Sequence, residues 1–555
     1  MSQIPFARLA LRETACVLAG AALISFAAIA PAQELTPGNL VVSRSVFVIN
    51  KSVVPGQILP PGCTSTSAGC AGAGGAIADS SYPFVFNNDI YDGSFGITSP
   101  IFLDQLTPKG DLINTIEVPN STQAGINSHS DQLVTSFSSK SELALHLSTD
   151  SQYLTFMGYV AGVNLLDVSN SNTQYAEDPT NPVGEKYFRA AATVNSAGKF
   201  TFTETNAYSG NNGRAAILNS AAGVFYTAGN AGNGSNPQPP GVVAGAGAQI
   251  LTHSTRSEYG QAPVSLTPVG SFSVTELGDK ADKIGKDDNF RGMTVFNNVV
   301  YFTKGSGSNG VNTVYFIDTT GTACPNGVGL PAVGATLPVT SIPYDPHTVA
   351  TTGLTSNMCI LKGFPTALAK TANPVAYPFG LWFANATTLY VADEGDGYVG
   401  GADLYTHAAA QTTAGLQKWI FNSTTQSWNL AYTLQKGLNI GVPYPLADYP
   451  VGTNSVTGLP WEPTTDGLRN FAGMVGDGTT VPVGKVSIYA VSSTVSGSGD
   501  PGADPNKIYW IEDDLAATTP AEVSKEIFYT YRYASAFEVL RGISFTPGTP
   551  NVTSF

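Results

Sequence analysis

Charged residues are scarce in this sequence of 555 residues. Asp, Glu, Lys and Arg make up 12% of it, whereas about 25% is typical of soluble domains. The 26 basic side chains are outnumbered by 40 acidic ones, and the net charge is −14. A phosphate-binding surface needs clustered Lys and Arg, and no such cluster occurs. We therefore expect no nucleic-acid partner.

Several other patterns are missing. After residue 32 no stretch approaches the roughly 18 apolar residues of a membrane span, so we expect no transmembrane segment in the mature chain. No helical 3.6-residue pattern lasts beyond the same point. The motifs G-x-S-x-G, H-E-x-x-H and the P-loop do not occur. Their absence argues against an enzyme without excluding one, because a site can be assembled from separate repeats.

The first 32 residues have the features of an export signal. Arg8 and Arg12 form a basic start, residues 15–29 are an apolar run, and Ala30-Pro31-Ala32 matches an A-x-A cleavage site. An uncleaved anchor is the alternative. We predict a mature chain that begins near residue 33 and is secreted, whether extracellular, periplasmic or bound at the cell surface.

Cysteines are few, and Cys16 lies within the predicted signal. Cys63 and Cys70 flank a short Ser- and Thr-rich loop, and we expect them to form one disulfide. Cys324 and Cys359 then remain as a second pair. The sequence has no C-x-x-C motif, and the spacing to histidine is irregular. These cysteines therefore indicate structural disulfides in an oxidising compartment.

What the sequence does contain is a repeated pair of short strands. The clearest copy, residues 289–303, reads Asn-Phe-Arg-Gly-Met-Thr-Val-Phe-Asn-Asn-Val-Val-Tyr-Phe-Thr, two apolar strands around an Asn-Asn turn. Apolar and polar residues alternate in most of the runs that follow the pairs, which is the period of a strand with one buried face. The copies begin near residues 141, 213, 290, 379, 468 and 541. Their spacing exceeds the roughly 40–50 residues of an ordinary propeller blade, so loops must carry insertions.

The two ends of the chain are incomplete in complementary ways. The last copy supplies only one strand, residues 541–545, and residues 40–118 supply three strand-like runs without an inner partner. Together they would form one four-stranded blade and leave no exposed edge at the closure. The sequence therefore predicts an all-β fold, a single propeller of six four-stranded blades over residues 33–555. Seven blades would result if residues 249–253 or 84–91 hide another unit.

Short phrases along the chain resemble a known set of proteins. They are Pro-Gly-Asn-Leu-Val-Val (37–42), Phe-Leu-Asp-Gln-Leu-Thr-Pro-Lys-Gly (102–110), Ala-Tyr-Ser-Gly-Asn-Asn (207–212), Pro-Phe-Gly-Leu-Trp-Phe-Ala (378–384), Leu-Tyr-Val-Ala-Asp (389–393) and Leu-Arg-Gly-Ile-Ser-Phe (540–545). The chain resembles a widespread family of secreted bacterial β-propeller-like proteins that has no agreed activity. The resemblance implies export and a repeated β fold, and it carries over no catalytic residue. The insertions at 52–82 and 317–350 are longer than that family leads us to expect.

Arginine stands at the start of four of the six predicted inner strands: Arg214, Arg291, Arg469 and Arg541. Inner strands line the central channel of a propeller, so these guanidinium groups would surround one mouth of the channel. Such a ring could capture a carboxylate or phosphate through bidentate hydrogen bonds. The alternative is that each arginine bonds to a neighbouring blade and holds the ring together.

Residues 393–397, Asp-Glu-Gly-Asp-Gly, place three carboxylates on a tight turn after a strand. Ca²⁺ prefers several oxygen ligands on such a turn, which makes Asp393 and Asp396 candidate ligands. The twelve-residue spacing of an EF-hand is missing, and a solvated turn is the alternative.

Three further side chains have candidate roles. We expect His146, on a predicted strand, to be buried and hydrogen-bonded rather than a ligand. His347, in a long loop, is the best candidate for a general base. Trp461, also in a loop, could stack against a sugar ring.

Two functional hypotheses remain. The favoured one is a binding module whose ligand, a small anion, a glycan or a protein, lies at the channel mouth or on the long loops at 52–82, 317–350 and 398–412. The other is an extracellular hydrolase or lyase that acts on an ester or an acidic sugar, with Ca²⁺ as a candidate cofactor.

Overall fold

The computed structural model describes most of the chain from residue 34 to residue 552. It does not describe residues 1–33, 55–95, 127–131, 138–141, 174–186, 231–246, 255–266, 269–288, 306, 308, 325, 341–357, 455–457, 498–501, 551 and 553–555. All described residues belong to one compact unit, residues 33–555. The predicted export signal, the Cys63–Cys70 pair and His347 lie outside the described residues, so they stay predictions.

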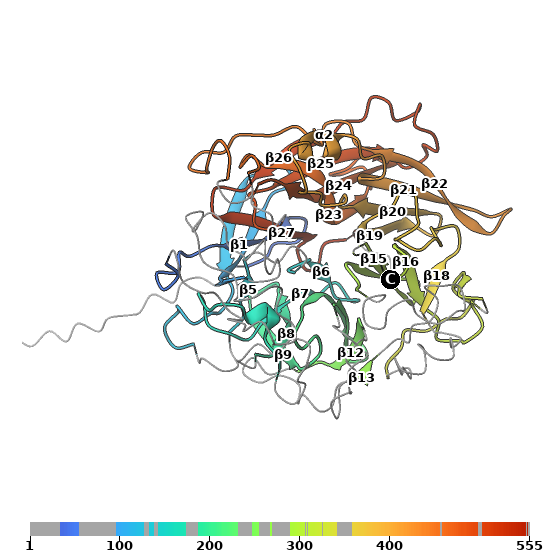
Figure 1. The fold of residues 1–555 in the computed structure, drawn as a ribbon. Coiled ribbons are helices and arrows are strands. Elements are labelled where there is room, and N and C mark those ends of the chain that lie inside the picture. The colour runs from blue at the N-terminus through green and yellow to red at the C-terminus, as the bar shows by residue number, and fades with distance from the viewer. Residues whose placement is uncertain are drawn as a thin grey trace, which may run out of the picture. The chain divides into compact units, whose positions relative to one another are not determined.

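Six small antiparallel sheets are arranged as a six-bladed propeller, which confirms the predicted fold class (Figure 1). Each blade has four strands, named in order from the innermost outward. Blade 1 is β27 (Glu538–Phe545), β1 (Leu40–Val46), β3 (Ile101–Leu106) and β4 (Leu112–Glu117); blade 2 is β6 (His146–Leu147), β7 (Tyr153–Tyr159), β8 (Arg189–Asn195) and β9 (Phe200–Thr205); blade 3 is β10 (Gly213–Asn219), β11 (Val224–Gly229), β12 (Ala248–Thr252) and β13 (Thr267–Pro268). Blade 4 is β14 (Met293–Phe296), β15 (Val299–Lys304), β16 (Thr313–Ile317) and β18 (Met358–Leu361); blade 5 is β19 (Pro378–Asn385), β20 (Thr388–Asp393), β21 (Gly415–Asn422) and β22 (Ser427–Leu434); blade 6 is β23 (Thr464–Val475), β24 (Lys485–Val495), β25 (Lys507–Asp514) and β26 (Tyr529–Tyr533).

A few elements lie outside this pattern. The short strand β17 (Val328–Gly329) adds to blade 4 in parallel with β18, and β2 (Thr98–Ser99) pairs with β5 (Thr135–Ser136). One short helix, α2 (Leu404–Ala409), and the 3₁₀ turn η1 (Val168–Asn170) are the helical elements of the described residues. The helix was not predicted, because six residues are too few to establish a helical period.

Blade 1 closes the ring with strands from both ends of the chain. β1 runs antiparallel to β27, with Leu40 opposite Phe545 and Val46 opposite Glu538, as predicted. This pairing removes the edges at which a propeller could open. Residues 249–252 lie in β12 of blade 3, so this region does not form a seventh blade. The second candidate region, residues 84–91, lies outside the described residues.

The hydrophobic core lies between adjacent blades. Phe296 of blade 4 and Phe383 of blade 5, for example, stack with ring centroids 4.3 Å apart. The hairpin that carries Phe296 turns at Asn297 and Asn298, whose φ angles are 47° and 60°. Asparagine tolerates this left-handed conformation, and two such residues form the tight turn that the sequence predicts.

Glycines allow the inner strands to approach one another closely. A Cβ atom on Gly292 would lie 2.1 Å from the carbonyl oxygen of Phe379 in the next blade, and one on Gly542 would lie 2.2 Å from that of Leu143. Each of these glycines directly follows an arginine, Arg291 or Arg541. The Arg-Gly pair therefore combines a side chain at the channel mouth with a backbone contact that only glycine permits.

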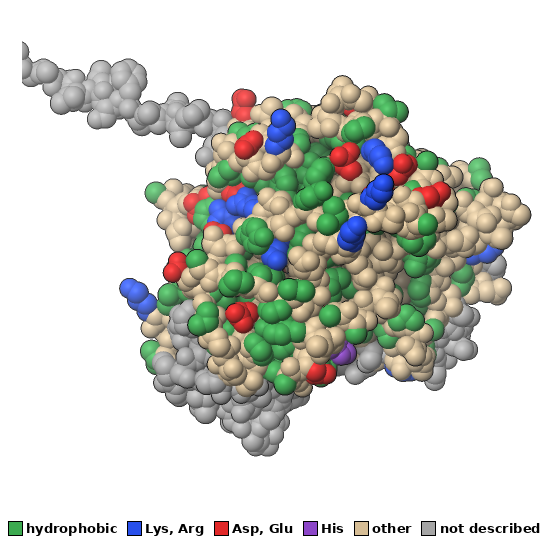
Figure 2. All heavy atoms as spheres, turned by 90° about the horizontal axis from the view of Figure 1, so that it is seen from above, with side chains coloured by type: hydrophobic (Ala, Val, Ile, Leu, Met, Phe, Trp, Pro, Cys, Tyr) green, Lys and Arg blue, Asp and Glu red, His purple; other side chains and the backbone are tan. Residues whose placement is uncertain are grey.

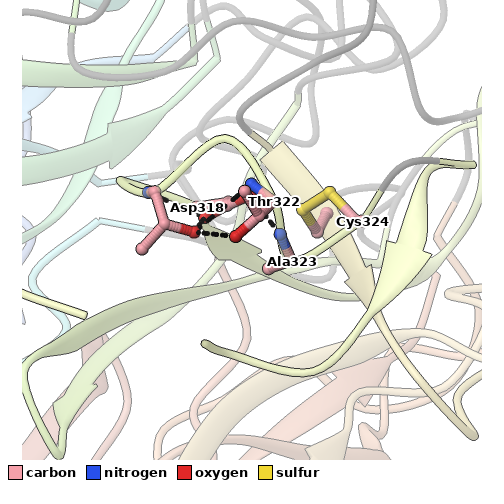
Figure 3. Close-up of a disulfide and its surroundings, with 6 residues drawn as sticks. Asp318, Thr322, Ala323 and Cys324 are labelled. Carbon is pink, nitrogen blue, oxygen red and sulfur yellow. Dashed lines mark hydrogen bonds between the residues drawn. A yellow bond between two sulfur atoms is a disulfide. The ribbon is translucent and has the colours of Figure 1, made fainter. Parts of the chain in front are cut away.

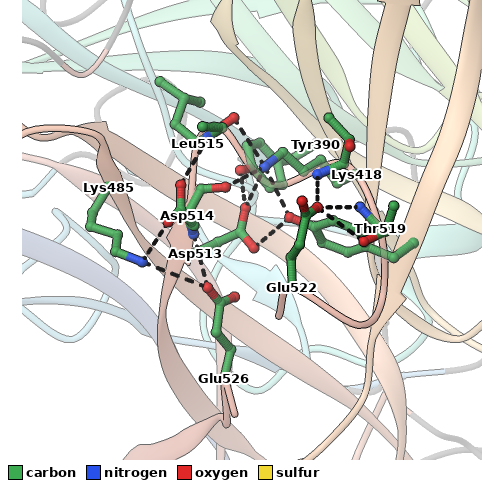
Figure 4. A network of polar contacts seen from close by, with 12 residues as sticks. Tyr390, Lys418, Lys485, Asp513, Asp514, Leu515, Thr519, Glu522 and Glu526 are labelled. Carbon is green, nitrogen blue, oxygen red and sulfur yellow. Dashed lines mark hydrogen bonds and ion pairs between the residues drawn. The ribbon is translucent and has the colours of Figure 1, made fainter. Parts of the chain in front are cut away.

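Blades 5 and 6 are joined by a buried polar network (Figure 4). The Lys418 ammonium lies 2.9 Å from the Asp513 carboxylate, and neither side chain is exposed to solvent. Tyr432 donates a hydrogen bond of 2.7 Å to the same carboxylate, and Tyr390 also donates to it. Removing one member of a buried ion pair is strongly destabilising, so this network is a structural link between the two blades.

The surface carries few charges. Figure 2 shows a face on which a few Lys, Arg, Asp and Glu side chains, some of them in small mixed groups, lie among hydrophobic and uncharged polar side chains. Within the described residues no helix is long and apolar enough to cross a membrane.

Cys324 and Cys359 form a disulfide, as predicted (Figure 3). Cys359 lies in β18, and Cys324 lies in the connection that follows β16. Together with Asp318 these cysteines are the one group in the described part of the chain whose atoms are spaced like metal ligands. The sulfurs are bonded to each other and cannot act as thiolates, and Asp318 accepts hydrogen bonds from the N–H groups of Thr320 and Ala323. This group is therefore a loop staple.

Candidate functional site

The four predicted arginines are buried, each with 4% of its surface exposed. Arg214 lies at the start of β10 and Arg291 just before β14, whereas Arg469 and Arg541 lie in the middle of β23 and β27. Arg214 of blade 3 donates a hydrogen bond of 2.7 Å to the Phe290 carbonyl, which precedes β14 of blade 4. Arg541 of blade 1 donates to the carbonyl of Phe137, which follows β5. These contacts between neighbouring parts of the ring match the structural alternative for Arg214 and Arg541.

Arg291 and Arg469 differ, because both contact one carboxylate. The Nε atom of Arg291 lies 3.4 Å from Glu394 Oε1, and that of Arg469 lies 3.1 Å from Glu394 Oε2. Burial is the main cause that lowers the pKa of Arg291, the Arg469 charge lowers it further, and the Glu394 charge opposes both. Glu394 thus joins blades 4, 5 and 6 at the channel mouth.

Beside this bridge lies a recess of about 370 Å³, counting its side open to solvent. We call it the mouth recess. Its polar lining side chains are Arg291, Tyr377, Glu394, Asp396, Asp466, Arg469 and Thr494. Glycines form the rest of its wall, and Gly395 packs closely against Asp466, since a Cβ atom on Gly395 would lie 2.3 Å from the Asp466 carboxylate. Two of the four predicted arginines, Arg291 and Arg469, therefore meet the acidic turn at 393–397 at one place.

Arg469 is one of the residues that line the mouth recess. Its Nε atom donates a hydrogen bond to Glu394, and its two Nη atoms make no hydrogen bond within the described residues. A guanidinium presented in this way can bind a carboxylate through two parallel hydrogen bonds.

Two buried carboxyl groups at the site titrate near neutrality. Burial raises the pKa of Asp466 to about 7, against hydrogen bonds from the Gly397 N–H and the Gln411 amide that favour its charged form. Burial likewise raises the pKa of Asp393 to about 7. A carboxyl group with this pKa can both give and accept a proton at neutral pH. Asp466 lines the mouth recess, whereas Asp393 lies behind it.

The insertion between β20 and β21 supplies a carboxylate–imidazole pair. The Nε2 atom of His407, on α2, lies 2.6 Å from Asp396 Oδ2. The Tyr398 ring stacks on the imidazole with ring centroids 4.0 Å apart. The His407 side chain is 37% exposed, and its partner Asp396 is one of the residues that line the recess. Glu394, Asp466 and His407 were not predicted as site residues; the contacts of Glu394 with Arg469 and of Asp466 with Gln411 span 75 and 55 residues of sequence.

Calcium binding by Asp393 and Asp396 stays a prediction that the geometry does not favour. The two Asp393 oxygens accept hydrogen bonds from the backbone N–H groups of Tyr377 (2.8 Å) and Gly395 (3.0 Å). Asp396 accepts one from Tyr398 N–H at 3.0 Å, in addition to the contact with His407. An ion would have to replace these donors.

One other expectation needs correction. Trp461 is only 6% exposed and therefore offers no open ring surface for a sugar. His146 lies on a strand, as predicted, and its ring has backbone hydrogen bonds with Met293 and Ala144.

The fold and the recess define the class: a six-bladed propeller with a polar recess at one channel mouth. No known family model matches the sequence, and no curated protein matches it. Among solved structures, similarity was found to a polysaccharide lyase of family PL25, an ulvan lyase bound to -[GlcA(1-4)Rha3S]-, with 11% identity, 86% of this chain and 96% of that chain covered, and a TM-score of 0.28. An ACO/RPE65 chimera has 7% identity and a TM-score of 0.20, with 81% of this chain and 58% of that chain covered. A mutant of the Synechocystis apocarotenoid oxygenase has 9% identity and a TM-score of 0.18, with 81% of this chain and 59% of that chain covered. The chain thus spans less than two thirds of the two oxygenase-type chains, and similarities this weak carry no argument about function.

Proposed function

We propose that this protein is a secreted or surface-located binding module that holds a small acidic ligand in the mouth recess. The observation that carries the proposal is Arg469, which lines the recess and whose two Nη atoms have no hydrogen-bond partner in the described residues. The ligand carboxylate would take the position that this fork offers. The Cys324–Cys359 disulfide supports an oxidising compartment outside the cytosol.

The acidic lining residues indicate the rest of the ligand. Asp396 and Asp466 line the same recess and would repel a second negative charge, whereas they accept hydrogen bonds from hydroxyl groups. A molecule with one carboxylate and several hydroxyls, such as a uronic acid unit of a glycan, suits this lining.

A titration with glucuronate and short uronic acid oligomers tests this proposal. Charged hydrogen bonds contribute about 1.5–3 kcal/mol each, so Arg469→Ala should weaken binding by about 10- to 100-fold. Arg291→Ala should weaken binding as well, because it shares Glu394 with Arg469. Lys485→Ala, which removes a partly exposed cation on β24, is the matched control. No binding by the natural chain, or equal binding by Arg469→Ala, would refute the proposal.

A second candidate function is a hydrolase or lyase that acts on an ester or an acidic sugar. Asp466 favours it, because its pKa of about 7 suits proton transfer at neutral pH. Turnover of acidic polysaccharides should then fall at least about 100-fold in Asp466→Asn and stay unchanged in Asp477→Asn, an exposed control. Loss of turnover on addition of a chelator would assign a role to Ca²⁺. Binding without turnover by the natural chain would leave the binding module as the function.

A further inference from the structure

Two carboxylates that line the mouth recess, those of Glu394 and Asp466, differ in the charges that contact them. Glu394 lies 3.4 Å from the Arg291 guanidinium and 3.1 Å from that of Arg469. Asp466 has no ion pair with Lys, Arg or His within the described part of the chain. Its two oxygens accept hydrogen bonds from a backbone N–H of the acidic turn, at 2.9 Å, and from the Gln411 amide. The charge of Glu394 is therefore compensated by two cations, whereas that of Asp466 is not.

Irregular pairing of β23 accounts for the presence of Asp466 and Arg469 in the same recess. Residues three apart on a regular strand point to opposite faces of the sheet. The pairing of β23 with β24 shifts register twice, and Asp466 and Arg469 each lie within one of these shifts. Such irregularities change the direction of side chains and are common beside functional sites. One strand thereby supplies both a guanidinium and a carboxylate to the lining.

Burial determines the pH range in which Asp466 carries its charge. Only 1% of the residue is exposed, and burial raises its pKa to about 7, although two hydrogen bonds favour the charged form. The carboxyl group is therefore mostly neutral below about pH 6 and mostly ionised above about pH 8. The charged and titratable groups around it are Arg291, Tyr377, Glu394, Asp396 and Arg469 in the lining, with Asp393 behind the recess and His407 beside Asp396.

We propose that Asp466 is the specificity-determining residue of the mouth recess: it excludes ligands with a second negative charge when ionised and admits them when protonated. This role rests on the proposed function, in which Arg469 holds the first carboxylate of the ligand. Like charges a few ångströms apart repel each other strongly where water is partly excluded, and no cation contacts Asp466 to weaken this repulsion. A proton on Asp466 removes the charge and supplies an O–H donor for the second carboxylate. Above neutral pH the ligand is therefore a sugar acid with a single carboxylate.

Gluconate and glucarate are the probes, because the CH₂OH group of gluconate is a second carboxylate in glucarate and the two are otherwise alike. Isothermal titration calorimetry of the full chain at pH 8 should give a dissociation constant for glucarate at least about 10-fold above that for gluconate. At pH 5.5 this ratio should fall to about 2 or less, because Asp466 is then protonated. In Asp466→Asn the ratio should be about 2 or less at both pH values.

Asp393→Asn is the matched control. Asp393 is as deeply buried as Asp466, and burial also raises its pKa to about 7, but it does not line the recess. This variant should therefore keep the pH dependence of the natural chain. If the pH dependence survives in Asp466→Asn, or disappears in Asp393→Asn, a group other than Asp466 causes it and the proposal is wrong.

The natural chain alone gives a test that does not depend on either variant folding. Equal affinity for gluconate and glucarate at pH 8, or a ratio that stays constant from pH 5.5 to 8, would overturn the role of Asp466 and leave the proposed function in place. Absence of gluconate binding at every pH would refute the proposed function, and the role of Asp466 with it.

Discussion

Substituting Glu394 by Gln tests whether one carboxylate holds three blades together. Gln has nearly the same shape, so the substitution removes the negative charge that the Arg291 and Arg469 guanidiniums contact at 3.4 Å and 3.1 Å. Glu394 is 5% exposed and both arginines are 4% exposed, so water cannot replace the lost charge. Breaking a buried ion pair costs about 3–5 kcal/mol, and we expect the free energy of unfolding to fall by this amount.

A second ion pair on the same chain provides the control. Arg44 and Glu538 lie 2.6 Å apart with 14% and 22% of their side chains exposed, and Arg44 also contacts Asp104. Partly exposed pairs of this kind contribute about 0–1 kcal/mol, so Glu538→Gln should have a small effect. Urea denaturation of both variants at pH 7 measures the difference. If the two substitutions change the unfolding midpoint equally, the bridging role of Glu394 is wrong.

Three further predictions concern stability. The folded-state pKa of Asp466 is raised from 3.8 to about 7, so protonation of this carboxyl group stabilises the folded state fully below about pH 4, and on the order of 4 kcal/mol of that stabilisation is lost as the pH rises through 7. Asp466→Asn should remove this part of the pH dependence of the urea unfolding midpoint, measured from pH 4.5 to 8. An unchanged pH dependence would count against the assignment. The disulfide between Cys324 and Cys359 closes a loop with a sequence separation of 35 and so restricts the unfolded chain. Replacing both cysteines by serine should therefore lower the free energy of unfolding by about 3–4 kcal/mol, and a change below about 1 kcal/mol would contradict this reasoning. Gly292→Ala would place a Cβ atom 2.1 Å from a backbone carbonyl oxygen, whereas in the control Gly162→Ala the nearest atom would lie 3.5 Å from the new Cβ atom. We expect the free energy of unfolding to fall by at least about 3 kcal/mol in Gly292→Ala alone. Equal thermal stability of the two variants would refute the close approach of the two strands.

The fold was predictable because each blade carries its own local signal. Alternating apolar residues and turn residues identify strands without any knowledge of distant contacts, as the Asn297-Asn298 hairpin shows. The two ends of the chain predicted the pairing of β1 with β27. The C-terminal end has an inner strand without outer strands, and the N-terminal end has three outer strands without an inner one, so together they make one complete blade.

The site was only half predictable, because its contacts cross blades. The sequence places Arg291 and Arg469 at the channel mouth, but their shared partner Glu394 lies roughly 75–100 residues away from either in the sequence. Likewise, the raised pKa of Asp466 depends on burial under the insertion that follows β20, which no local pattern reveals. The surroundings of His146 could not be predicted for the same reason, since this side chain lines a cavity formed by several inner strands.

The affinity of Arg469→Lys for glucuronate tests the central claim most directly. Lysine keeps the positive charge beside Glu394 but lacks the planar fork that binds a carboxylate through two hydrogen bonds. If the mouth recess is the ligand site, the dissociation constant for glucuronate measured by isothermal titration calorimetry should rise at least about 10-fold, while the folded structure is retained. Equal affinity of the natural chain and Arg469→Lys would show that the ligand does not bind at the Arg469 guanidinium.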